Sequence, residues 1–169
     1  KVGSTDPLKN QYFYSNDATK LYKYYPYWDG GTTVLVRTLD RNYFDIAMTS
    51  DGTVYGITSS GALYKNLEVD NEEFIANTGA DQNGLAAGPN DELYIFDNNH
   101  IQNIVRIDHG NGNTITQTIV ASNLDLYNRG DLVIVEGEFY LTANRGSSKN
   151  GDTDLFKVGQ GSNDVTLLA

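Results

Sequence analysis

The sequence predicts an all-β fold in which about four similar units, each of four short antiparallel strands, follow one another along the chain. Three observations support this prediction: the composition, two short patterns that recur in a fixed order, and the turn signals between them. The 169 residues include 18 Asn, 16 Asp and 17 Gly, which favour turns and are disfavoured inside helices. The composition therefore indicates short strands joined by many polar turns.

Two short patterns recur four times, always in the same order. The first is an apolar residue followed by Tyr, and its copies lie 41, 39 and 46 residues apart. The second is an apolar residue, then an aromatic or apolar residue, then a cation, and its copies lie 42, 41 and 51 residues apart. The copies of the first are Phe13-Tyr14, Val54-Tyr55, Leu93-Tyr94 and Phe139-Tyr140, and those of the second are Leu21-Tyr22-Lys23, Leu63-Tyr64-Lys65, Ile104-Val105-Arg106 and Leu155-Phe156-Lys157. Because two independent patterns keep similar spacings, they indicate four structural repeats.

The second unit shows the expected strands most clearly. We predict strands at 44–49, 53–57, 62–67 and 73–77, with a tight hairpin at Asp51-Gly52. Its first strand is small and apolar, as expected for burial on both faces, whereas the second and third carry Tyr and a cation, as expected for partial exposure. Four antiparallel strands in about 40 to 50 residues are typical of a β-propeller blade. We therefore predict one propeller-type domain over 1–169, with units at about 11–40, 44–78, 83–121 and 130–169.

The first unit is incomplete. Its expected strands are 11–15, 20–24 and 33–39, and the strand that should precede them falls in 1–10, which reads as polar coil with Pro7. Three interpretations remain open. The chain forms a four-bladed ring whose N-terminal segment supplies the missing strand, or it is half of an eight-bladed propeller that pairs with a second copy, or it is part of a longer propeller chain. Open end blades expose apolar faces, so we expect ring closure or a partner that covers them.

The second unit resembles the repeat of secreted bacterial β-propellers. The residues that carry the resemblance are Asp-Gly-Thr-Val-Tyr-Gly at 51–56 and Leu-Tyr-Lys at 63–65, against a family pattern of Asp-Gly-Thr-Leu-Tyr-Gly and Leu-Tyr-x-Ile. The third unit is similar at 83–86 and 92–94, and the fourth is looser. The resemblance covers most of 11–169 and implies the fold and a secreted bacterial setting. It says little about activity, because this family is functionally mixed.

The charge excludes several classes of partner. Asp and Glu outnumber Lys and Arg by 22 to 12, which gives a formal net charge of −10. Nucleic acids and anionic membranes need a basic surface, so neither is an expected partner. The chain has no Cys, which excludes disulfides and thiolate metal sites. It has no apolar run close to the roughly 20 residues that span a bilayer, and we predict an extracellular or cell-surface location without membrane insertion.

Two loops are candidate binding sites. Tyr27 and Trp28 end the densest aromatic cluster, in a loop expected to project from one rim, and we predict that they contact a protein or carbohydrate ligand. The alternative is that such aromatics fill the space between blades. Asn150, Asp152 and Asp154 are the best candidates for calcium ligands, because carboxylate and amide oxygens suit this cation. The alternative is that these Asp and Asn side chains bond to their own backbone, as is common in turns. Calcium is the only cofactor that the sequence suggests.

Asp45, Asn83 and Asp131 occupy similar positions at the starts of the expected inner strands. Together they form the best enzymatic clue, because a propeller hydrolase or lyase would place its site at the axial mouth, with or without a cation. The chain lacks a Gly-x-Ser-x-Gly elbow, and its acids cannot be paired from the sequence. We therefore predict a non-catalytic module for adhesion, matrix or surface assembly, with the axial enzyme as alternative. A homo-oligomer that covers the incomplete blade is the second expected partner.

Overall fold

The computed structural model describes residues 11–17, 19–27, 30–79, 82–97, 103–109, 115–145, 153–159 and 164–168. These residues form fifteen β-strands and no helix, which confirms the all-β prediction. Accordingly, the described part of the chain has no helix of the length and apolar character needed to cross a membrane.

The strands form four antiparallel sheets, each built from consecutive segments of the chain, as in the blades of a β-propeller. Among the described residues, blade 1 has the three strands expected from Gln11 onward, and blades 2 to 4 have four each. The strands are β1 (Phe13–Asp17), β2 (Lys20–Tyr25) and β3 (Thr32–Thr38) in blade 1, β4 (Asp45–Met48), β5 (Val54–Ile57), β6 (Ala62–Lys65) and β7 (Glu73–Asn77) in blade 2, β8 (Gln82–Ala87), β9 (Leu93–Asp97), β10 (Asn103–His109) and β11 (Ile115–Ala121) in blade 3, and β12 (Leu126–Val135), β13 (Glu138–Arg145), β14 (Asp154–Val158) and β15 (Val165–Leu167) in blade 4.

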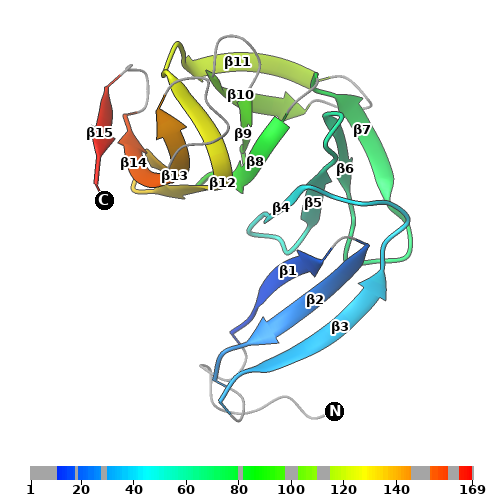
Figure 1. Ribbon diagram of the computed structural model, residues 1–169. Coiled ribbons are helices and arrows are strands. Elements are labelled where there is room, and N and C mark those ends of the chain that lie inside the picture. The colour runs from blue at the N-terminus through cyan, green and yellow to red at the C-terminus, as the bar shows by residue number, and fades with distance from the viewer. Residues whose placement is uncertain are drawn as a thin grey trace.

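The four blades follow one another around an arc (Figure 1). The inner strands β4, β8 and β12 contact one another in that order, and β1 contacts β4. Blade 1 has no strand equivalent to these inner strands among the described residues, because β1 carries the Phe13-Tyr14 pattern that lies on the second strand of the other blades. Within the described ranges, blades 1 and 4 make no extensive contact, so the arc is open between them.

Three apolar clusters lie at the three junctions between consecutive blades. The largest joins blades 3 and 4 and includes Phe96, Phe139 and Phe156, all fully buried. The cluster between blades 2 and 3 is mostly aliphatic. The cluster between blades 1 and 2 is the smallest, with five buried members. Burial of these side chains stabilises the propeller, because apolar area removed from water contributes about 25 cal/mol per Å².

A polar network supplements the small cluster between blades 1 and 2. The carboxylate of Glu72 is fully buried and accepts hydrogen bonds from the backbone N–H of Asp40 at 2.8 Å, from the Arg41 guanidinium at 2.7 Å and from the Tyr43 hydroxyl at 2.7 Å. Asn16 on β1 donates from Nδ2 to the carbonyl of Tyr43 at 2.9 Å. The link between the two blades is thus tied to both of them by hydrogen bonds.

The second recurring pattern coincides with a structural irregularity. In blades 1, 2 and 3, the strand that carries this pattern pairs with the last strand of its blade. The register of this pairing shifts by one residue between the first and second residues of the pattern. The shifts lie at Leu21/Tyr22, Leu63/Tyr64 and Ile104/Val105. The last strand has one extra residue there, which is the arrangement of a β-bulge. The pattern therefore marks a repeated bend in the blade as well as a repeated composition.

The expected burial of the strands is wrong in one respect. The second strands, β5 and the first four residues of β9, are fully buried, whereas β4 is partly exposed. The reason is the position of each strand. The second strand lies between two strands of its own sheet and between two neighbouring blades. The first strand lies at the inner edge of its sheet, where one side has no further strand. The tyrosines Tyr55 and Tyr94 are therefore core residues.

The hairpin predicted at Asp51-Gly52 is present, and blade 4 has a second one. Gly52 has φ +90° in the turn that joins β4 and β5, where the N–H of Gly52 donates to the carbonyl of Thr49 at 3.0 Å. Between β12 and β13, Glu136 and Gly137 both have positive φ, as the two central residues of a type I′ hairpin require. These turns hold the first two strands of their blades in register.

Candidate functional site

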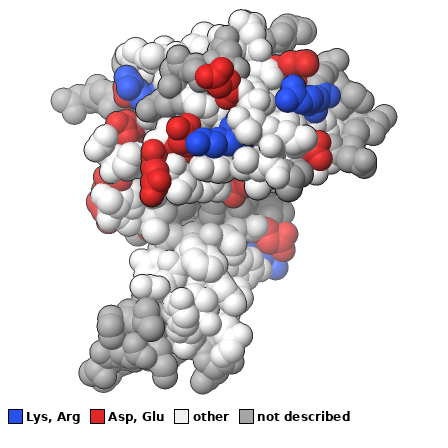
Figure 2. Space-filling model, turned by 90° about the vertical axis from the view of Figure 1, so that its left-hand side faces the viewer, with Lys and Arg blue, Asp and Glu red and all other residues white. Residues whose placement is uncertain are grey.

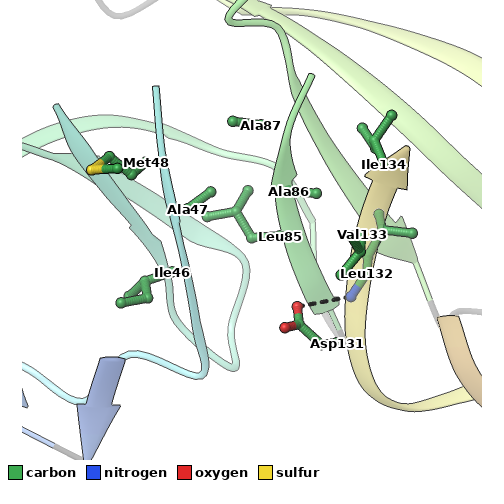
Figure 3. A pocket seen from close by; sticks show the side chains of 10 residues that line it. All are labelled: Ile46, Ala47, Met48, Leu85, Ala86, Ala87, Asp131, Leu132, Val133 and Ile134. Atoms are coloured by element: carbon green, nitrogen blue, oxygen red, sulfur yellow. Dashed lines mark hydrogen bonds between the residues drawn. The ribbon is translucent and has the colours of Figure 1, made fainter. Parts of the chain in front are cut away.

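A hollow lies at the centre of the arc, between the inner strands (Figure 3). It is open to solvent, has a volume of about 220 Å³, and is lined by apolar side chains from all three inner strands and by one acid, Asp131. The lining residues are Ile46 to Met48 on β4, Leu85 to Ala87 on β8 and Asp131 to Ile134 on β12. Because blade 1 has no described inner strand, three of the four blades form this wall.

Two of the three acidic or amide residues expected at the axis are neighbours. Asp45 begins β4, and its carboxylate accepts hydrogen bonds from the N–H of Ile46 at 2.8 Å and of Leu85 on β8 at 2.6 Å. Asp131 on β12 accepts from the N–H of Leu132 at 2.8 Å. The two carboxyl groups are also close enough to affect each other's ionisation. This proximity brings acids from blades 2 and 4 together across blade 3.

The surroundings make this pair hard to ionise fully. Burial, reinforced by the charge of Asp131, raises the pKa of Asp45 to about 7. Burial also raises the pKa of Asp131, although this residue is the more exposed of the two. Because two neighbouring carboxylates resist carrying charge together, the pair loses its last proton only near pH 7. One carboxyl that donates a proton and one that accepts it are the minimum for acid–base chemistry.

Gly84 lets the inner strands approach closely. Its φ is +121°, and a Cβ there would lie 2.7 Å from Nδ2 of Asn128 and 3.3 Å from Cβ of Leu132. Asn128 is fully buried on β12 beside it. The close approach positions Leu85, whose N–H reaches Asp45. Asn83 lies just before Gly84 on β8, and its side chain is outside the described residues, so its place in the axial group stays a prediction.

Neither the known protein-family models nor the curated proteins include a match to this chain. The function of the axial pair therefore has to be judged from geometry. Among the described residues, no group of three or more His, Cys, Asp or Glu side chains is placed to hold a metal ion. Two carboxylates that already accept backbone hydrogen bonds are a sparse ligand set for a hard cation, which prefers six or more oxygens.

The loop predicted to bind calcium is only partly described. Asn150 and Asp152 lie outside the described residues. Asp154 begins β14, where it is half-buried and pairs in register with Ala143. Calcium binding at these residues stays a prediction.

Blade 1 carries a second candidate site, an aromatic surface formed by Tyr12, Lys23 and Tyr25 and followed in the chain by the exposed Tyr27. The Tyr12 and Tyr25 rings are 5.6 Å apart between centroids, and the Lys23 ammonium lies 4.1 Å from the centroid of Tyr12. Tyr27, one of the two residues predicted to bind ligand, is 51% exposed. Trp28 lies outside the described residues. The sequence could not assign Tyr12 to this surface, because its contact with Tyr25 depends on how β1 pairs with β2.

Proposed function

We propose that this chain is a non-catalytic extracellular binding module, and that the aromatic surface of its first blade contacts the ligand. The observation that carries the proposal is the contrast between blade 1 and the rest of the molecule. In Figure 2 the lower part, where β1–β3 lie, is almost without charged side chains on the face shown, whereas the upper part carries many. The aromatic surface itself carries one cation, Lys23, and no acid, on a protein of net charge −10, and such a cluster of partly exposed tyrosines is typical of a binding surface.

A neutral carbohydrate fits this surface better than a protein does. Tyr12 and Tyr25 supply ring faces for the apolar face of a sugar, and their hydroxyls can exchange hydrogen bonds with sugar hydroxyls. Lys23 is the only cation of this surface and is held over the ring of Tyr12, so the surface offers a single positive charge to an acidic partner. Secretion and roles in adhesion, matrix or surface assembly belong to the same proposal and follow from the composition and the repeat resemblance.

Affinity electrophoresis through gels that contain dextran, hydroxyethylcellulose or xylan tests the proposal. We expect at least one of these polysaccharides to retard the protein. The double variant Tyr25→Ala/Tyr27→Ala should lose about tenfold in affinity, which corresponds to about 1.4 kcal/mol. Phe44→Ala is the matched control, because Phe44 is 55% exposed and lies outside the aromatic surface. If no neutral polysaccharide retards the wild-type protein, the carbohydrate proposal is wrong.

The axial acid pair supports a second candidate, a hydrolase or lyase with Asp45 and Asp131 as acid and base. The observation in its favour is a pair of neighbouring acids at the edge of a solvent-accessible hollow, where burial raises the pKa of Asp45 to about 7. An enzyme of this kind would lose its activity in both Asp45→Asn and Asp131→Asn. Turnover of a chromogenic glycoside or uronide that survives both substitutions would rule the acid pair out as its site.

A further inference from the structure

The repeat orients its side chains by one rule at every junction between blades. On the second strand, the first residue of the apolar-Tyr pattern packs against the preceding blade, and the Tyr packs against the following blade. Val54, Leu93 and Phe139 are each fully buried in the cluster shared with the preceding blade. Tyr55 and Tyr94 belong to the cluster shared with the following blade, and Tyr94 packs edge-on against Phe139 with ring centroids 5.3 Å apart.

Other strands follow a matching rule. The first residue of the cation pattern, at Leu21, Leu63 and Ile104, is fully buried against the following blade. On the inner strand, Ala47 and Ala86 face the following blade and are at most 9% exposed. Every junction therefore joins two different faces, which we call the trailing face of one blade and the leading face of the next.

Both kinds of face have exposed apolar side chains at the ends of the arc, and no other described part of the chain covers them. The leading face of blade 1 presents Phe13, which is 54% exposed although its three equivalents are fully buried. The trailing face of blade 4 presents Val133, Tyr140 and Leu155. Val133 is 47% exposed and Leu155 is 37% exposed, whereas their equivalents in the other blades are at most 9% exposed. The ends thus expose the two halves of a junction that the fold makes three times internally.

We propose that a second copy of this chain covers these faces, with the trailing face of each copy packed on the leading face of the other. The partner is a second copy because the two end faces are the two halves of a junction that this chain already makes three times internally. A head-to-tail contact closes into a ring or grows into a filament. Two copies give eight blades, the upper end of the usual propeller range of four to eight, and three would exceed it. This inference does not depend on the proposed ligand.

The aromatic surface stays accessible in this ring. On β2, Lys23 and Tyr25 alternate with Tyr22 and Tyr24, so they point to the opposite side of the sheet. Phe13 pairs in register with Tyr24, with ring centroids 5.2 Å apart, and lies on that other side. Dimerisation and ligand binding therefore use different faces of blade 1.

Light scattering coupled to size exclusion tests the assembly. We expect the wild-type chain to elute with about twice the 18.6 kDa mass of one chain. Phe13→Glu and Tyr140→Lys each place a charge in both junctions of the ring, and each variant should be monomeric. Ile119→Glu is the matched control, because Ile119 is 57% exposed on β11, away from both end faces, and this variant should stay dimeric.

Mixing the two monomeric variants distinguishes a head-to-tail ring from other dimers. The mixed ring has one native junction and one junction in which the introduced lysine of one copy meets the introduced glutamate of the other, so the dimer mass should return. Circular dichroism of each variant must match the wild type, which separates a lost contact from misfolding. A monomeric wild-type chain at about 100 µM, dimeric single variants, or a mixture that stays monomeric would each overturn the proposal.

Discussion

The junction between blades 1 and 2 and the junction between blades 3 and 4 are built differently. The second is an apolar cluster with three fully buried phenylalanines, Phe96, Phe139 and Phe156. The first has a cluster of only five buried residues and depends also on hydrogen bonds to the buried carboxylate of Glu72. Apolar packing is sensitive to small shifts but needs no specific hydrogen-bond partners. A buried carboxylate stabilises the junction only while all its hydrogen-bond donors are in place. We therefore expect blade 1 to be the most easily detached blade.

The largest expected effect is at the apolar junction. Phe139→Ala removes a fully buried ring that contacts Tyr94, and we expect a loss of about 3–5 kcal/mol in the free energy of unfolding. Urea denaturation measures it. The exposed Phe44 serves as control, since Phe44→Ala should cost less than about 0.5 kcal/mol. If Phe139→Ala lowers the free energy of unfolding by less than about 1 kcal/mol, the apolar junction is not what mainly stabilises blade 4.

A smaller effect is expected at the polar junction. Glu72→Gln keeps the size of the side chain but weakens its bonds to Arg41 and Tyr43, and we expect a loss of about 1–3 kcal/mol. Hydrogen exchange should show where the loss falls: amides of β1 and β2 should exchange faster, and those of β13 should be unchanged. Equal acceleration in all four blades would show that blade 1 does not detach separately.

The smallest expected effect concerns the acid pair, and it depends on pH. Because the pKa of Asp45 is raised from 3.8 to about 7, the folded chain binds more protons than the unfolded chain between these values. The contribution of Asp45 to the free energy of unfolding therefore falls as the pH rises from about 4 to 7 and is constant above. Asp45→Asn cannot ionise, so it should gain about 1.4 kcal/mol relative to the wild type for each pH unit between about pH 5 and pH 6. Parallel stability curves for the two proteins would contradict the raised pKa.

Much of the architecture could be predicted from the sequence, because it depends on a local period. The spacing of Val54-Tyr55 and its equivalents indicated the blades, and Asp51-Gly52 indicated a hairpin where the structure has one. The three strands described in blade 1 are those expected from Gln11 onward. Such features need only the chain's own order of turns and apolar residues.

The features that depend on contacts between distant residues could not be predicted. The burial of Tyr55 and Tyr94 was missed, because their polar hydroxyl suggests exposure while their position between two blades decides burial. Asp45 and Asp131 could be aligned by repeat position, but the raised pKa depends on desolvation that no pattern reports. The contact of Tyr12 with Tyr25 likewise depends on strand pairing in blade 1.

The rule that each blade presents a leading face and a trailing face has a consequence for how such a protein changes over time. Since every junction joins the same two faces, duplication of one unit of about 40 residues would insert a blade between existing neighbours and replace one junction by two of the same kind. Deletion of a unit would join the remaining faces in the same way. The number of blades in one chain can therefore drift by unequal recombination while the interfaces are inherited unchanged.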